Sequence, residues 1–293
     1  MDTASIITET RALLLEHYVF PDIATTLDAH LEQRLADGAY DAAKSPEELG
    51  ELVTADLQSV NGDRHLRLKH HADEIPDGDD GATTQVVVKE AARSLTGVPT
   101  LRALDGGVAL LELAPLLFPV EMSGDVVTAA FTLVADATAL ILDLRNNRGG
   151  DPFTVALICG YLFDEPTHLN TMYFRDGDSY HQSWSPAYVP GKRFGGTKPV
   201  FVLTSGRTFS GAEELAYDLQ QLGRATVIGE RTGGGAHPRR GFKVHAHLEA
   251  TVPTGRAINP VSDTNWELVG VVPDIEVPEA EALERAHREA LGR

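Results

Sequence analysis

Two turns, each joining an apolar run to a helical pattern, carry the residue types best suited to chemistry. The first turn reads DLRNNRGGDP (143–152) and brings Gly149 and Gly150 to a helix entry, where the backbone can approach a ligand closely. The second reads TSGRTFSGAEE (204–214) and places Ser210 where the chain enters a helix. Because the first N–H groups of a helix can stabilise a developing oxyanion, Ser210 is a candidate nucleophile.

Each turn also has a purely structural explanation. Ser210 followed three residues later by Glu213 fits a capping box, in which the serine only begins a helix. The Gly149-Gly150 pair fits a tight turn equally well. The spacing of these residues alone does not decide between a catalytic site and two ordinary helix N-termini.

The elements around these turns alternate between strands and helices. The pattern predicts a helix to residue 136, then strands at 139–144, 199–204 and 226–229, with helices at 152–163 and 210–222 between them. The strands are apolar without polar alternation, so they are buried on both faces of a layered α/β core. Ligands bind such sheets at the carboxyl ends of the strands, where both turns lie.

The first third of the chain has a different pattern. Apolar spacing between residues 5 and 58 predicts three helices, with Pro21 before the second and Ser45-Pro46 opening the third. Residues 70–84 are acidic with Pro and Gly and predict a loop, and Asp105-Gly106-Gly107 predicts a hairpin turn. We therefore expect a helical domain at 1–68, an acidic linker and β-hairpin region at 69–122, and a catalytic core at 123–293.

Composition excludes several classes of function. The 293 residues include 25 Lys and Arg against 43 Asp and Glu, a net charge of −18, which disfavours nucleic acid or an anionic membrane as a partner. One cysteine rules out an intramolecular disulfide framework and a cysteine-built metal site. The N-terminus has no signal-peptide pattern and no apolar run approaches a membrane span, so we expect a cytoplasmic location by default. A leader removed earlier and a homo-oligomer both stay open.

Five segments together resemble a known family. They are GDRH (62–65), LILDLRNNRGG (140–150), PVFVLTSGRTFSGAEELAYDL (199–219), RATVIGERTGGGAHP (224–238) and WELVGVVPDIEV (266–277). In order and spacing they resemble the C-terminal-processing (tail-specific) serine peptidases, the tricorn core protease and the repeats of interphotoreceptor retinoid-binding protein. The resemblance implies a small N-terminal helical domain, a ClpP/crotonase-like layered β/α core and a serine nucleophile at Ser210.

The resemblance also suggests the other catalytic residues. Gly235 stands where the tail-specific branch has its lysine base, and a glycine cannot accept a proton. The tricorn-like branch implies instead that His65 is the base and Glu267 the orienting carboxylate. It further implies an oxyanion hole made by the N–H of Gly211 and that of Gly150 or Gly149.

Several other residues have competing explanations. His237 could be an alternative base or a substrate contact, and Arg239 and Arg240 could pair with a peptide carboxylate, although a solvated loop explains all three. His245 and His247 are predicted on one face of a strand but have no third ligand, so no metal site is expected. Cys159 in an apolar helix is a core residue.

We therefore expect a serine hydrolase, most simply a peptidase working through an acyl-enzyme on Ser210, with no metal or cofactor. The stretch between His65 and Ser123 is too short for a PDZ domain, so a layout like that of the retinoid-binding repeats is favoured. The alternatives are a non-catalytic protein that binds a hydrophobic small molecule and a hydrolase of a non-peptide ester or amide. Arginines cluster in sequence around the two turns and predict an anionic guest such as a peptide C-terminus; they are Arg145, Arg148, Arg207, Arg231, Arg239 and Arg240.

Overall fold

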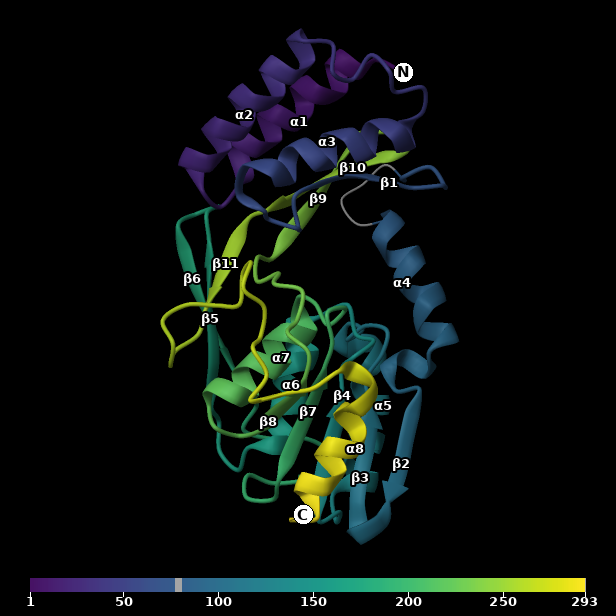
Figure 1. The fold of residues 1–293 in the computed structure, drawn as a ribbon, viewed down its shortest axis with the longest axis vertical. Coiled ribbons are helices and arrows are strands. Elements are labelled where there is room, and N and C mark those ends of the chain that lie inside the picture. The colour runs from purple at the N-terminus through teal and green to yellow at the C-terminus, as the bar shows by residue number, and fades with distance from the viewer. Residues whose placement is uncertain (77–80, 293) are drawn as a thin grey trace. The chain divides into compact units, whose positions relative to one another are not determined.

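The computed structural model describes residues 1–76 and 81–292 and divides the chain into two compact units (Figure 1). Unit 1 consists of Met1–Val86, Met172–His181 and His237–Ala257. Unit 2 consists of Val87–Thr171, Gln182–Ala236 and Ile258–Arg293. Among the helices in the described part of the chain, none is long and apolar enough to span a bilayer.

The three helices predicted in unit 1 are confirmed. They are α1 (Thr3–His17), α2 (Pro21–Ala36) and α3 (Pro46–Asn61). Ser45 begins α3 as expected, since its hydroxyl accepts a hydrogen bond from the Glu48 N–H at 3.2 Å. Proline in the first turn of α2 and α3 removes an N–H that would have no partner there.

An antiparallel sheet packs against these helices. It is formed by β1 (Arg67–His70), β10 (Leu248–Pro253) and β9 (Arg239–His245), in that spatial order. Leu68, Ala250 and Val252 point from the sheet into the apolar core with the helices. Residues 237–257 belong to unit 1 because β10 pairs with β1 and its apolar residues pack against the three helices. A second sheet has the order β11 (Gly255–Ile258), β5 (His168–Phe174) and β6 (Ser179–Trp184).

Two local expectations from sequence were wrong. His245 and His247 do not share a strand, because His245 is the last residue of β9 and His247 lies in the turn before β10. The predicted loop at 70–84 is interrupted by helix α4 (Gly81–Arg93), while its residues 77–80 lie outside the described part of the chain. A helix can extend into a polar segment when its other end is anchored, here by the buried Ala91.

Unit 2 is built on a six-stranded sheet. Its order is β12 (Ile275–Glu276), β8 (Thr226–Gly229), β7 (Val200–Thr204), β4 (Ala139–Asp143), β3 (Val108–Glu112) and β2 (Thr100–Leu104). Neighbouring strands are parallel except for the β2–β3 hairpin, which has the predicted DGG turn. Every residue of β4 and β7 is buried, so the predicted two-sided burial is confirmed.

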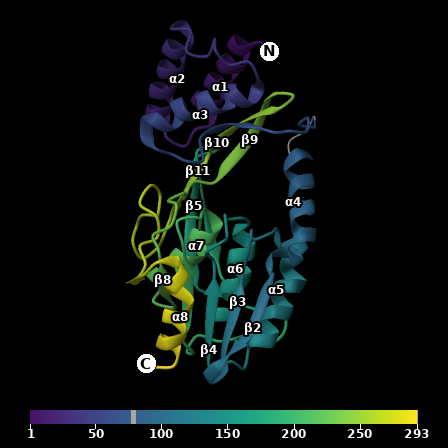
Figure 2. The same ribbon diagram turned by 45° about the vertical axis from the view of Figure 1, so that its right-hand side comes forward.

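Helices cover this sheet in layers (Figure 2). Helix α8 (Glu279–Ala290) packs against Ile141, Leu203 and Ile228 on one face. Helices α5 (Val120–Val134), α6 (Pro152–Leu162) and α7 (Gly211–Gln221) pack in a row, α6 between its two neighbours. The mixed α/β core predicted from sequence is confirmed, and the turns before α6 and α7 both begin at carboxyl ends of central strands.

Candidate active site

Ser210 has a strained backbone at the junction of β7 and α7. Its φ is 52° and its ψ is −124°, a region that L-residues rarely occupy. A serine that only caps a helix has an extended backbone, so capping does not account for this conformation. A serine on a sharp, strained strand-to-helix turn is the arrangement that presents a nucleophilic hydroxyl at the top of an α/β sheet.

Glu213 is a fully buried carboxylate that holds this turn. Its Oε2 accepts from the N–H of Ser210 at 2.7 Å and of Gly235 at 2.9 Å. Its Oε1 accepts from the Thr232 hydroxyl at 2.5 Å and from the Gly234 N–H at 2.7 Å. Burial raises the pKa of Glu213, and these hydrogen bonds oppose the rise. Four donors surround the carboxyl group, an arrangement that suits the ionised form because it carries no hydrogen of its own.

The two glycine turns converge within unit 2. A Cβ added to Gly211 would lie 2.7 Å from the Gly150 oxygen and 3.1 Å from the Gly150 nitrogen. A Cβ on Gly149 would lie 2.7 Å from the Cβ of Ser210. The turn that carries Ser210 and the first turn are therefore in direct contact, at a distance that only glycine permits.

The structure separates the two candidate oxyanion donors of the first turn. The Gly149 N–H already donates to the Asn147 Oδ1 at 2.9 Å. Within residues 1–76 and 81–292, neither the Gly150 N–H nor the Gly211 N–H donates to a protein acceptor. Gly150 and Gly211, rather than Gly149, are thus the amides with hydrogen-bonding capacity left for a ligand.

Asn147 joins the two turns and was not singled out from the sequence. Its side chain is fully buried, and its Nδ2 donates to the Leu113 oxygen at 2.9 Å. Its backbone oxygen accepts from the N–H of Phe209, the residue before Ser210, at 3.1 Å. Gly150 is held from the other side by Leu117, whose oxygen would lie only 1.9 Å from an added Cβ. The first turn is therefore rigidly placed, as an oxyanion hole requires.

The arginines in the turns are largely engaged in ion pairs within unit 2. Arg145 pairs with both oxygens of Asp143, at 2.9 and 2.6 Å, and this partner raises the pKa of Arg145. Arg207 pairs with Glu279 at 2.8 Å. These two side chains already pair with carboxylates of the protein, which argues against the expectation that they bind an anionic ligand.

Glu267 lies in a turn rather than in a strand. Its Oε2 accepts from the Ala236 N–H at 2.5 Å. Beside it, the Trp266 indole donates to the Gly235 oxygen at 2.8 Å and the Leu268 N–H to the Gly234 oxygen at 3.0 Å. The segment that carries Glu267 therefore pairs with the loop that Glu213 holds.

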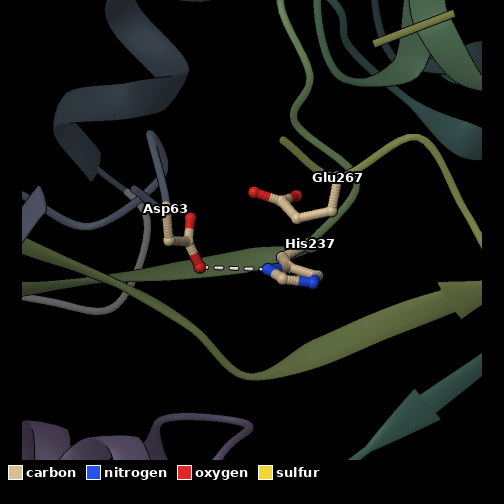
Figure 3. Close-up of side chains that lie close together, drawn as sticks. All are labelled: Asp63, His237 and Glu267. Carbon is tan, nitrogen blue, oxygen red and sulfur yellow. Dashed lines mark hydrogen bonds and ion pairs between the residues drawn. The ribbon is translucent and has the colours of Figure 1, made fainter. Parts of the chain in front are cut away.

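In unit 1, Asp63 is the centre of a buried polar cluster that includes His65 and His237. Figure 3 shows its contact with His237. Its Oδ2 lies 3.0 Å from the His237 Nδ1 and accepts from the Tyr18 hydroxyl at 3.0 Å, while its Oδ1 accepts from the His65 N–H at 3.0 Å. Burial alone would raise the pKa of Asp63, but the hydrogen bond from His237 and the nearby imidazoles lower it overall.

His65 is itself buried, which lowers the pKa of its imidazole to about 4. The nearby Asp63 charge opposes this shift without reversing it. The imidazole is therefore neutral at pH 7 and able to accept a proton.

The remaining predicted substrate contacts lie on β9 and point in opposite directions. Arg239 approaches the Glu249 Oε1 at 3.4 Å. Arg240 lies 3.7 Å from the Asp176 Oδ2 and stacks over the Phe242 ring, which packs against the core of unit 1. Consecutive strand residues face opposite sides of the sheet, so the two arginines cannot share one site on it.

Residues 118–277 match the model of a protein family described as Peptidase family S41. The match covers more than half of the chain. The chain belongs to peptidase family S41, a family of serine peptidases. Residues 2–96 also match the N-terminal domain of Peptidase_S41 in eukaryotic IRBP. The resemblance of the core to serine peptidases of this family and that of the N-terminal part to the retinoid-binding repeats are both confirmed.

Solved structures share the fold of this S41 peptidase along its whole length. A lipoprotein from Streptococcus agalactiae has a TM-score of 0.66 at 15% identity, covering 100% of this chain and 97% of that one. The photosystem II D1 C-terminal processing protease has a TM-score of 0.58 at 14% identity, with 97% of each chain covered. The tricorn protease has a TM-score of 0.60 at 13% identity over 99% of this chain and 36% of that one.

Proposed function

We propose that this S41 peptidase cleaves peptides through an acyl-enzyme on Ser210, with His65 as general base and Glu267 as the orienting carboxylate. The observation that carries the proposal is the strained backbone of Ser210 beside two amides with capacity for a ligand, those of Gly150 and Gly211. The family match supports the reaction class, and the position of His65 in the GDRH segment supports its role.

In the proposed reaction, neutral His65 removes the hydroxyl proton of Ser210 as the oxygen attacks the scissile carbonyl carbon. The carbonyl oxygen becomes an oxyanion and accepts hydrogen bonds from Gly150 and Gly211, each contributing about 3 kcal/mol in the transition state. His65 then returns the proton to the leaving amine as the C–N bond breaks. Water then attacks the acyl carbon while the same imidazole takes its proton. The ester bond to the Ser210 oxygen breaks, and His65 gives the proton to that oxygen, which restores the serine.

The site geometry favours an enzyme over a container for a hydrophobic molecule. Backbone strain at a serine costs of order 1–3 kcal/mol and serves no purpose in a protein that only encloses a ligand. A non-peptide ester or amide would use the same serine and amides, so a substrate panel that includes esters distinguishes that alternative.

A fluorophosphonate probe tests the proposal directly. Intact-mass analysis should find one adduct on the wild-type protein, and peptide mapping should place it on Ser210. Ser210→Ala should not react, and His65→Ala should react far more slowly because the hydroxyl has lost its base. A folded wild-type protein that takes up no probe would contradict the proposal.

The pH dependence should identify the base. Since burial lowers the pKa of His65 to about 4, the acid limb of kcat/KM should fall near pH 4 instead of near the ordinary histidine value of about 6.5. The enzyme should therefore keep most of its activity at pH 5.5. Initial rates on a fluorogenic peptide between pH 3.5 and 8 measure this.

Stability must be followed in the same buffers. The unfolded chain protonates His65 below about pH 6.5 while the folded chain does not, so this residue's contribution to stability is present above pH 6.5 and lost as pH falls towards 4. Circular dichroism separates unfolding from the loss of the base. If the acid limb of kcat/KM falls near pH 6.5 in a protein that is still folded, a buried His65 is not the group that titrates.

A further inference from the structure

The sheet β1-β10-β9 of unit 1 has one face on which four cations and one carboxylate lie. Its other face, with Leu68, Ala250 and Val252, is packed against the helices. Because side chains alternate along a strand, the neighbours of these residues point away from the helices. This second face includes Arg67 and Lys69 on β1.

Strand register brings further cations to the same face. Lys69 lies opposite Glu249, which in turn lies opposite Lys243. On β9, Arg239 lies opposite Pro253, two residues beyond Thr251, the partner of Arg67. Neighbouring strands are about 5 Å apart, so the cations of β1 and those of β9 lie on the same face about 10 Å from one another, across β10. We call Arg67, Lys69, Arg239 and Lys243 the cationic sheet face.

Glu249, the carboxylate within this face, is largely occupied. It is buried, and its Oε2 lies 2.7 Å from the His71 Nε2. Its other oxygen lies over Gly241, where an added Cβ would approach to 1.7 Å, and is 3.4 Å from Arg239. One carboxylate shared in this way leaves the face with a strong positive excess.

Arg67 and Lys69 show this excess most clearly. Both are exposed, and neither pairs with a carboxylate in the part of the chain that the structure describes. Partial burial lowers the pKa of both groups, and the neighbouring Arg239 lowers it further, while for Lys69 the charge of Glu249 opposes the shift. Four like charges that share a single carboxylate favour binding of a further anion.

The face adjoins the proposed general base. His65 is two residues before Arg67, and its backbone oxygen accepts from the Thr251 hydroxyl at 2.6 Å, so it continues the row of this sheet. Elsewhere the chain carries a large negative excess, −18 overall, which repels anions. An anionic peptide is therefore expected to be attracted to the surface beside His65.

We propose that the cationic sheet face binds carboxylates of the peptide substrate, so that this peptidase prefers acidic peptides. The inference rests on the proposed function for its link to cleavage, but binding can be measured without cleavage. Arginine binds carboxylates through paired N–H donors and lysine as a point charge, so the face suits either side-chain carboxylates or a C-terminal one.

Fluorescence anisotropy with the Ser210→Ala protein tests binding alone. Four labelled twelve-residue peptides serve as probes, one with four Glu and its counterpart with four Gln, each with a free or an amidated C-terminus. The Glu peptides should bind at least about tenfold more tightly at 50 mM NaCl, and the difference should shrink at 500 mM because salt screens exposed charges. A preference that follows the free C-terminus instead would identify the terminal carboxylate as the bound group. Equal binding of all four peptides would overturn the proposal.

Charge reversal locates the effect. Arg67→Glu and Lys69→Glu should each weaken binding of the preferred peptide by about tenfold or more, with the Gln amide peptide little affected. Arg102→Glu, the same change at an exposed position of β2, should alter binding less than about twofold. Equal losses in all three variants would show a net-charge effect and no site.

Kinetics then connect the face to catalysis. In the active protein, Arg67→Glu should raise KM for the Glu peptide and leave kcat nearly unchanged. If the peptides bind as expected but wild type cleaves none of them, the proposed function fails while the binding site stands. If a neutral peptide is cleaved but the Glu peptides bind no more tightly than it does, the binding proposal fails while the proposed peptidase activity is supported.

Discussion

Replacing Ser210 with glycine is expected to abolish hydrolysis while raising the melting temperature. The native φ of 52° and ψ of −124° are strained for serine but accessible to glycine. Relief of strain should outweigh the added entropy of glycine in the unfolded chain by about 1 kcal/mol, or about 2 °C in a chain of this size. Hydrolysis should fall by about 10⁴-fold or more because the nucleophile is gone. Peptide hydrolysis and calorimetry on the same sample measure both effects.

Ser210→Ala is the matched control for this prediction. It removes the same hydroxyl but keeps the Cβ that causes the strain, so it should be as inactive as the glycine variant with a melting temperature near that of wild type. If Ser210 were only a helix cap, losing the hydroxyl would destabilise the alanine variant by about 1 kcal/mol. A melting temperature below wild type in both variants would thus favour the capping explanation over a strained nucleophile.

The strand-turn-helix units of the core could be predicted because their signals are local. β4 and β7 are continuous apolar runs, and Pro152 marks the first turn of α6 at the residue expected. The turn residues were found for the same reason, since glycine pairs and a serine before a helix are visible in a few letters. Their convergence was not visible, because it depends on β4 and β7 being neighbours in the sheet.

Other features depend on contacts between distant segments. Glu213 looked like half of a capping box, yet three of its four donors come from residues 232–235. Asn147 looked like an ordinary turn residue, although it links the first turn to Phe209. The pairing of β10 with β1 joins residues about 180 positions apart and produces the cationic sheet face. No local pattern encodes such pairing, since strand partners are chosen by packing as much as by sequence.

Replacing Glu213 with glutamine is expected to lower kcat by about 10²- to 10³-fold with little change in KM. A carboxylate accepts at both oxygens, and all four donors around Glu213 need acceptors. In either orientation the glutamine NH₂ would face at least one backbone N–H, leaving buried donors unpaired at about 1–3 kcal/mol each. The Ser210 turn should shift as a result, and a shift of about 1 Å is enough for such a loss. Steady-state kinetics and the rate of fluorophosphonate labelling measure it.

Glu214→Gln makes the same chemical change one residue further along the helix and should have the opposite outcome. Glu214 is also buried, and this burial raises its pKa to about 7; burial and the neighbouring Glu214 also raise the pKa of Asp218. Within the described residues, the only hydrogen bond that its carboxyl group accepts is a long one of 3.4 Å from the Asn170 amide. A neutral amide therefore suits this position, and kcat should stay within about threefold of wild type with stability unchanged or slightly higher. If both variants lose activity equally, general disturbance of α7 explains the loss; if only Glu213→Gln does, the carboxylate positions the nucleophile. A Glu213→Gln protein with wild-type kcat would show that the four hydrogen bonds do not support catalysis.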